Sequence, residues 1–429
     1  MSAQETRTVR PAQTFNRLTR DPLTRTAWPL VLNTGTNGLL GVAFWVVAAR
    51  LYDQETIATN TALIAAMTTL SGISQLNLGP GLAVLLPRGG STARGVLLSV
   101  YGVVTAFSIL VLTVFGLVLL PLLDNLSATL DSGQRTLLFA VAVLAFNLFA
   151  LQDAALVALR RGKFVPVENA AFGVSKIVLV AVFSAALPAL GVFVSWLVPM
   201  LILVPVVSTL LLRTTRTNHV PAVVPEREPV RRLALDYVGY LFQVSSTFFL
   251  PVVALELLEP SGAALFAVAW LTSSTLDLLA TNIGTALTVE TSYGGDPSAL
   301  RRTTVRRALP LVAGVSVAGL LAAPLILHVY GGQYAEHGAL TLQVLLLASV
   351  PRSLVTFAVA EARAHRRMGV IVSLRAQNAA LVLGLSVLLA PRMGVEGMAV
   401  AWLTAQLAGA ASAWLQVFRR DPVPEGRPR

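Results

Sequence analysis

A single lysine, Lys176, lies deep within an apolar stretch of the chain, where a charge is costly and is usually functional. Two apolar segments flank the basic turn Arg-Arg-Gly-Lys at residues 160–163 and can fold back on each other as two antiparallel helices. At 1.5 Å per residue, Lys176 would lie roughly 20 Å beyond the turn, near the bilayer middle. Asn147 on the preceding segment reaches a similar depth. We therefore expect a mid-membrane cation in a water-filled cavity, with Asn147 beside it. The alternatives are a lysine that snorkels to the interface or one that pairs with a carboxylate.

Two arginines also lie inside apolar segments. Arg352 follows Pro351 about 14 residues into its segment, and Arg375 lies one to two turns from the end of another. A charged group inside a membrane span is a candidate functional residue, and both arginines are candidates on that ground. The structural alternatives, which give the arginines no role in function, are a buried ion pair for Arg352 and a side chain that snorkels to the interface for Arg375.

Carboxylates at depth are fewer. Asp277 is in the middle of an apolar segment, whereas Asp153 lies near the end of one, where the hairpin places it opposite Asn169 and near Glu168. Either Asp277 or Asp153 could bind a coupling proton or sodium ion. For Asp277, pairing with a deep cation is an equally good interpretation.

Signatures of enzymes and metal sites are missing from the sequence. There is no cysteine, the four histidines are scattered, and neither GxxxxGK[ST] nor HExxH occurs. We therefore expect no catalytic activity, no cofactor and no metal site.

The composition predicts an all-α protein that crosses the membrane many times. The chain is 55% hydrophobic and only 12% charged, with a mean hydropathy of +0.72, whereas soluble domains are about a quarter charged. A net charge of +11 could suggest nucleic acid, but the basic residues form short clusters between apolar segments, so we expect no nucleic-acid partner. Twelve apolar spans are predicted, near residues 27–49, 57–78, 95–120, 136–159, 164–186, 190–212, 233–255, 262–288, 304–327, 338–360, 368–390 and 395–417.

The basic residues also predict the orientation of the chain. Alternate connections hold 26 lysines and arginines, whereas the opposite connections hold only Arg50, Arg135 and Arg392. Because basic loops stay on the cytoplasmic side, both termini should be cytoplasmic. The N-terminal tail lacks the apolar region of a secretory signal and could contact anionic lipid.

The chain divides into two similar halves. Asn169-Ala-Ala is matched by Asn378-Ala-Ala, 209 positions later, and Trp196 by Trp402, 206 positions later. Such matches predict a duplicated six-helix unit, and an even helix number makes the repeat parallel. The predicted parts are a tail (1–26), a six-helix bundle (27–213), a linker (214–232), a second six-helix bundle (233–418) and a tail (419–429).

Three segments carry a family resemblance: AARLYDQE at 48–55, QLNLGPGLAVLLPR at 75–88 and QDAALVALRRGKFVPVENAAFGVSK at 152–176. They resemble polysaccharide flippases, including O-antigen flippases, of the multidrug/oligosaccharidyl-lipid/polysaccharide exporter superfamily. The resemblance implies two six-helix bundles that move undecaprenyl-diphosphate-linked glycans across the bacterial inner membrane by alternating access.

The resemblance also implies roles for residues. Lys176 and Asn169 look like the family's fifth-helix pattern, while Arg352 and Arg375 fit its cationic cavity without matching a fixed motif. Membrane lipids, and glycosyltransferases or a polysaccharide polymerase, would be the partners. Two alternatives stay open: an ion-coupled exporter of drugs or small molecules, and a membrane scaffold for glycosyltransferases that transports nothing.

The orientation can be tested by labelling, because the chain contains no native cysteine. Single cysteines at Asp131 and Glu336 should react with an impermeant reagent in intact cells, while those at Gly162 and Thr217 should react only after permeabilisation. Labelling of Gly162 from outside would reverse the predicted topology.

Overall fold

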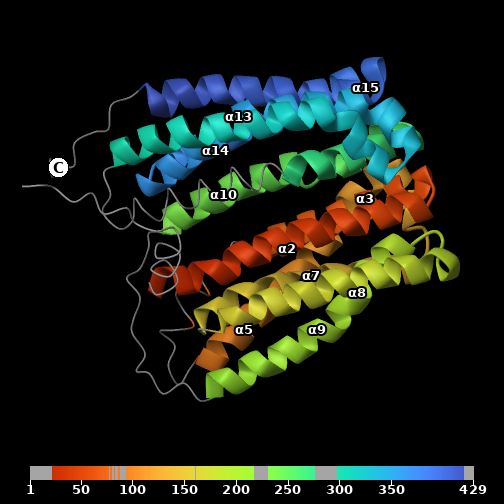
Figure 1. Ribbon diagram of the computed structural model, residues 1–429. Coiled ribbons are helices and arrows are strands. Elements are labelled where there is room, and N and C mark those ends of the chain that lie inside the picture. Colours follow the sequence, from red (N-terminus) through yellow and green to blue (C-terminus); the bar gives the residue numbers. More distant parts are fainter. Residues whose placement is uncertain are drawn as a thin grey trace, which may run out of the picture.

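The computed structural model describes residues 22–76, 78–79, 82, 86, 93–159, 161–216, 230–275 and 297–419. Within these ranges the chain is helical apart from short connections, and no strand is present. Figure 1 shows two groups of long helices lying side by side, one from each half of the chain. The all-α fold predicted from the sequence is confirmed.

The first group is built from long helices joined by tight turns. A short turn joins Pro22–Leu51 to Gln54–Ser74, and the basic turn that contains Lys163 joins Gly133–Ala158 to Val165–Ala186. Its elements are α2 (Pro22–Leu51), α3 (Gln54–Ser74), α5 (Ala93–Val114), η2 (Phe115–Leu119), η3 (Leu120–Leu122), α6 (Asp124–Thr129), α7 (Gly133–Ala158), η4 (Gly162–Phe164), α8 (Val165–Ala186) and α9 (Gly191–Arg216).

The second group repeats this order. Its elements are α10 (Val230–Thr247), α11 (Leu250–Leu257), a helical stretch at residues 260–275, α13 (Pro297–Tyr330), α14 (Gly332–Ala364), α15 (Met368–Ala413) and η5 (Trp414–Phe418). α15 contains the last two predicted spans, which meet at a kink where Gly394 has φ 62° and ψ −139°. A positive φ of this kind favours glycine, and Pro391 shortly before it weakens the helical hydrogen bonding.

Local sequence explains several helix ends. The Asp53 side chain accepts a hydrogen bond from the backbone N–H of Thr56 at 2.7 Å and so caps the first turn of α3. Ser132 caps α7 in the same way, by accepting from the N–H of Arg135. The predicted spans end within a few residues of the helices where the structure describes them, because these caps and the turns between the helices interrupt the apolar pattern.

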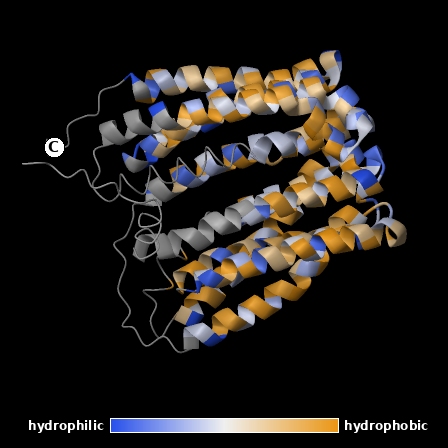
Figure 2. Ribbon diagram, viewed as in Figure 1, coloured by the Kyte–Doolittle hydropathy of each residue, from blue (hydrophilic) through white to orange (hydrophobic). Residues whose placement is uncertain are grey.

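Nine helices in the described ranges are long and apolar enough to cross a membrane. Hydrophobic residues dominate them, and hydrophilic residues gather toward their ends (Figure 2). Large apolar side chains point outward from the bundles, such as Leu117, Leu321 and Leu325, which are 75%, 79% and 71% exposed. Such surfaces suit contact with lipid tails and not with water.

The two halves touch along α3 and α10, where the Tyr237 hydroxyl donates to the Ile73 carbonyl at 2.8 Å. They also touch through helix ends at the far end of the molecule, opposite the described chain ends. The Glu256 carboxylate on α11 accepts hydrogen bonds from the backbone N–H groups of Asn125 (3.0 Å) and Leu126 (2.9 Å), which open α6. The Asn125 side-chain amide in turn donates to the Leu255 carbonyl at 2.9 Å. Free amides at a helix N-terminus favour an anion, so a carboxylate of one half is bound by a helix of the other.

A second contact of this kind has the opposite polarity. The Arg50 guanidinium, at the end of α2, donates to the Val329 carbonyl at 2.8 Å and to the His328 carbonyl at 3.4 Å. These carbonyls lie in the last turn of α13, where a cation is favoured. We call these two sets of hydrogen bonds, made by Glu256 and Arg50, the far-end clamp.

The clamp can be tested on Glu256. Replacing it with Ala removes the acceptor of two amides, a loss comparable to that of a helix cap, about 0.5–2 kcal/mol. Hydrogen exchange of the peptide covering residues 124–129 should therefore become about tenfold faster. Glu259→Ala is the matched control, because Glu259 is exposed and its side chain makes no hydrogen bond within the described ranges. Equal exchange in the two variants would contradict the clamp.

Candidate functional site

Lys176 lies near the middle of α8 and points into the first bundle. Its side chain shares a helix face with Phe172, one turn earlier, as the four-residue spacing requires. Only 7% of Lys176 is exposed. The long side chain therefore does not reach the interface, and the snorkelling alternative is wrong.

Three aromatic rings surround the Lys176 ammonium. Its Nζ lies 4.2 Å from the centroid of the Trp196 ring, 4.9 Å from that of Phe44 and 5.0 Å from that of Phe172. All three distances are within the range in which a cation is attracted to the face of an aromatic ring. We call Phe44, Phe172 and Trp196 the aromatic cage.

The cage is assembled by three helices that pack on one another. Phe44 is on α2, Phe172 on α8 and Trp196 on α9, and α8 packs against both of the others. Trp196 makes edge-to-face contacts with Phe44 (centroids 6.1 Å apart) and with Phe172 (5.6 Å), and Phe149 supports Phe172 from α7 at 4.9 Å. Such ring pairs fix each other's orientation, so the cage is rigid.

Within the part of the chain that the structure describes, the Lys176 ammonium has no hydrogen bond and no ion pair; its contacts are the three rings. The expected water-filled surroundings are therefore wrong for this conformation. Asp277, the carboxylate considered as a rival partner, lies outside the described residues.

Asn147 does not reach the lysine. Its side-chain amide donates to the Ser108 hydroxyl of α5 at 2.7 Å, and its Oδ1 has no hydrogen-bond partner among the described residues. The hairpin places Asn147 and Lys176 at a similar depth. However, α7 is rotated about its axis so that Asn147 faces Ser108 of α5 and not Lys176. The expectation that Asn147 lies beside Lys176 is not supported by any contact.

The structure brings Asp153 and Asn169 together, as the hairpin predicts. The Asn169 amide donates to Asp153 Oδ2 at 3.1 Å, across the α7–α8 pair. The neighbouring residue Glu168 is only 4% exposed, and neither of its carboxylate oxygens has a hydrogen-bond partner in the described ranges. Buried acceptors without donors are costly, so this polar group of α7 and α8 is suited to taking up a proton or a cation.

The second half carries a related but different arrangement. The Arg352 guanidinium on α14 lies 4.7 Å from the ring centroid of Trp402, which in turn meets Trp270 edge to face at 4.6 Å. The repeat predicted from the sequence matches Trp402 with Trp196. Each half places a cation on the face of one of these two tryptophans, Lys176 from α8 and Arg352 from α14.

Arg375 lies elsewhere in the second half. It packs against α10 where Gly239 leaves room, and a Cβ added to that glycine would be 3.6 Å from Arg375 Cδ and Nη1. Asn378, which the predicted repeat matches with Asn169, also lies in this half: it donates to Ser246 at 3.2 Å and accepts from Gln406 at 2.8 Å. The three predicted cations thus occupy separate positions, with Lys176 in one half and the two arginines in the other.

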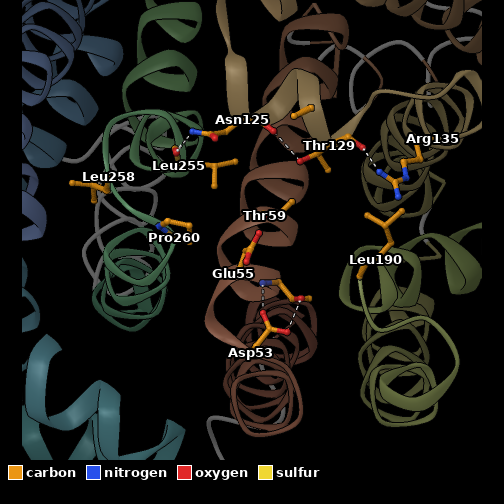
Figure 3. A pocket seen from close by; sticks show the side chains of 13 residues that line it. Asp53, Glu55, Thr59, Asn125, Thr129, Arg135, Leu190, Leu255, Leu258 and Pro260 are labelled. Carbon is orange, nitrogen blue, oxygen red and sulfur yellow. Dashed lines mark hydrogen bonds between the residues drawn. The ribbon is translucent and has the colours of Figure 1, made fainter.

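A chamber of about 530 Å³ lies at the far end, next to the clamp (Figure 3). Both halves contribute to it, since Asp53 and Glu55 of α3 line it together with Leu255 and Leu258 of the α11 region. Asn125, which bonds to Leu255, lines it too. The sequence analysis did not predict this chamber.

Sequence reasoning found the lysine but missed its surroundings. The spacing of Phe172 and Lys176 is a usable signal for a shared face, and Trp196 belongs to a repeated motif. Nothing in the sequence links Phe44, 132 residues before Lys176, to the same site. That link exists only because α2 packs on α8.

With this geometry in hand, the chain can be compared with known proteins. No family model and no curated protein matches it. Solved structures do match. An inward-facing multidrug resistance MATE family transporter of the MOP superfamily is 15% identical, with a TM-score of 0.65, over 89% of this chain and 93% of the other. The outward-facing conformation of a MATE family transporter gives 14% identity and 0.59, over 93% and 96%.

A further match is a MOP superfamily transporter from Pyrococcus furiosus, described as having a binding pocket of reverse polarity. It is 15% identical, with a TM-score of 0.60, over 93% of this chain and 95% of the other. At such identities the likeness concerns the fold. The chain therefore shares the all-helical, two-bundle fold of these transporters, and the polysaccharide-flippase subtype stays a proposal.

The Asn169–Asp153 contact predicts a coupling that can be measured. Asn169→Ala leaves a partly buried carboxylate without its donor, which should lower the free energy of unfolding by about 1–2 kcal/mol. Thermal unfolding of the purified protein in detergent would measure this. Asp153→Ala should cost less in the Asn169→Ala background than in the native chain. Strict additivity of the two changes would contradict the contact.

Proposed function

We propose that this protein is a membrane transporter that flips a lipid-linked glycan, carried on undecaprenyl diphosphate, from the cytoplasmic to the outer leaflet. The two bundles would rock against each other to give alternating access. The MOP superfamily fold supports a transporter, and the sequence resemblance to polysaccharide flippases supports the glycan substrate.

The observation that carries the proposal is the enclosure of Lys176 by aromatic rings. A carboxylate partner would cancel the lysine's charge, whereas the face of a neutral ring stabilises the ammonium and leaves the net charge in place. The first half therefore retains a positive charge at mid-membrane that no described carboxylate neutralises. An anionic headgroup such as a diphosphate suits that charge.

A second donor supports an anionic ligand. The indole Nε1 of Trp196 is buried and has no hydrogen-bond acceptor among the described residues. An ammonium and an N–H group that both lack acceptors belong to a site in which the ligand supplies the oxygens. We assign the diphosphate to Lys176 and, from the other half, to Arg352.

The remaining predicted residues fit supporting roles. Arg375, near the end of its helix, would attract the anionic headgroup as it enters, while Asn169 would hold Asp153 and Asn147, bonded to Ser108, would act only as part of the helix packing. Asp153, next to the buried Glu168, is our candidate for coupling transport to a proton or cation. Asp277 stays a sequence prediction, because it lies outside the described residues.

The proposed setting follows from the sequence. We propose a multi-pass protein of the bacterial inner membrane with both termini in the cytoplasm, because of the distribution of arginines. Membrane lipids surround it, and glycosyltransferases or a polysaccharide polymerase would supply or consume the glycan. The scaffold alternative predicts that no charge within the membrane matters.

Binding of undecaprenyl diphosphate to the purified protein tests the proposal, with uncharged undecaprenol as the control ligand. Lys176→Ala should weaken binding of the diphosphate at least about tenfold, because a charge-assisted contact is lost, while Lys176→Arg should keep part of it. Lys163→Ala is the matched control, because Lys163 is exposed and lies on one ring only, at 5.3 Å. Undecaprenol binding should not change.

Transport of a labelled lipid-linked glycan in reconstituted vesicles gives the second measurement. Lys176→Ala should insert normally but lose transport. If Lys176 were instead a structural ion pair with Asp277, the variant would express poorly and Asp277→Ala would restore it. Full transport by well-expressed Lys176→Ala would refute the proposal. Export of cationic drugs by the native chain would favour the multidrug alternative, which the named structural neighbours also fit.

A further inference from the structure

The choice of lysine at position 176 is unusual in this chain. The sequence contains 32 lysines and arginines, of which only Lys163 and Lys176 are lysines. An arginine carries the charge on a flat fork of five donors, whereas a lysine ends in a compact ammonium. A closed set of ring faces suits the compact group.

The cage has the construction of an ammonium-binding site. Three ring centroids lie within 5.0 Å of one nitrogen, and the rings come from three helices, of which α8 packs against both α2 and α9. Aromatic cages of this kind recognise alkylated and quaternary ammonium ligands. Here the occupant is tethered to the protein itself.

We propose that Phe44, Phe172 and Trp196 form an organic-ammonium site that the chain fills with its own Lys176. The filled cage makes these residues determinants of specificity: a cationic substrate finds its site occupied and a like charge in place. The inference concerns the same site as the proposed function and deepens it, but it is tested by binding of a cation. The two can therefore fail separately.

The geometry suggests a matched ligand for the emptied cage. Lys176→Ala removes Cγ, Cδ, Cε and Nζ, which are the four heavy atoms of n-propylammonium. That ion can restore the lost charge and the lost contacts together. 1-Propanol has nearly the same shape but no charge, and so separates cation recognition from simple cavity filling.

The experiment is a thermal-unfolding titration of purified Lys176→Ala protein in detergent. Propylammonium chloride should raise its Tm by about 2–4 °C in a saturable manner, while 1-propanol and sodium chloride should not. The native chain should show no saturable shift, because its cage is full. Lys163→Ala, which removes the other lysine and leaves the cage filled, should behave like the native chain.

Two further variants link any shift to the cage. Lys176→Ala combined with Trp196→Leu should bind propylammonium about tenfold more weakly, since the nearest ring is lost. Lys176→Met fills the space with an uncharged chain of similar length and should show no shift. If Lys176→Ala does not fold alone, propylammonium in the expression medium should restore its folded yield and 1-propanol should not.

The outcomes separate cleanly. Equal effects of propylammonium and 1-propanol, or a full shift that survives loss of Trp196, would overturn the ammonium site, as would failure of both compounds to restore an unfolded variant. A saturable shift confined to Lys176→Ala would establish it. If the native chain instead binds undecaprenyl diphosphate but the emptied cage ignores ammonium ions, the proposed function stands and only this inference fails.

Discussion

The interaction on which the site depends is the attraction between one ammonium group and three ring faces. At mid-membrane a lysine costs roughly 2.5–3.5 kcal/mol on insertion scales. A cation–ring contact contributes about 2 kcal/mol when water is absent, so three rings offset the cost without a counter-charge. Because Phe44, Phe172 and Trp196 come from α2, α8 and α9, keeping Lys176 charged also requires these helices to stay packed. The charge and the architecture of the first bundle therefore depend on each other.

The two halves place a cation on a tryptophan ring in different ways. The repeat predicted from the sequence pairs Trp196 with Trp402, and each ring has a cation on its face, yet Lys176 comes from α8 and Arg352 from α14. A side chain can reach a given ring from more than one neighbouring helix. The two halves thus differ in which helix supplies the cation.

Closure of the far end uses interactions of moderate strength. Glu256 meets the amides that open α6, and Arg50 meets the carbonyls that end α13. Contacts between a charge and a helix end contribute roughly 0.3–1 kcal/mol each at exposed positions, enough to bias a conformation without locking it. The chamber beside them is lined by both halves. A rocking motion of the bundles would have to break these contacts, and it can do so at modest cost.

The sequence by itself determined the helical fold, the positions of most spans and the buried lysine, because all three follow from local patterns. An apolar run of about 20 residues forms a helix in lipid, because its backbone N–H and C=O groups find no water there and must bond to each other. The sequence also predicted that Asp153 lies opposite Asn169, because the position of the turn alone sets which residues of the two helices face each other. Tertiary structure decided what the sequence could not. Rotation of a helix about its axis is set by packing with distant helices, so Asn147 faces Ser108 and Phe44 joins the cage from 132 residues away.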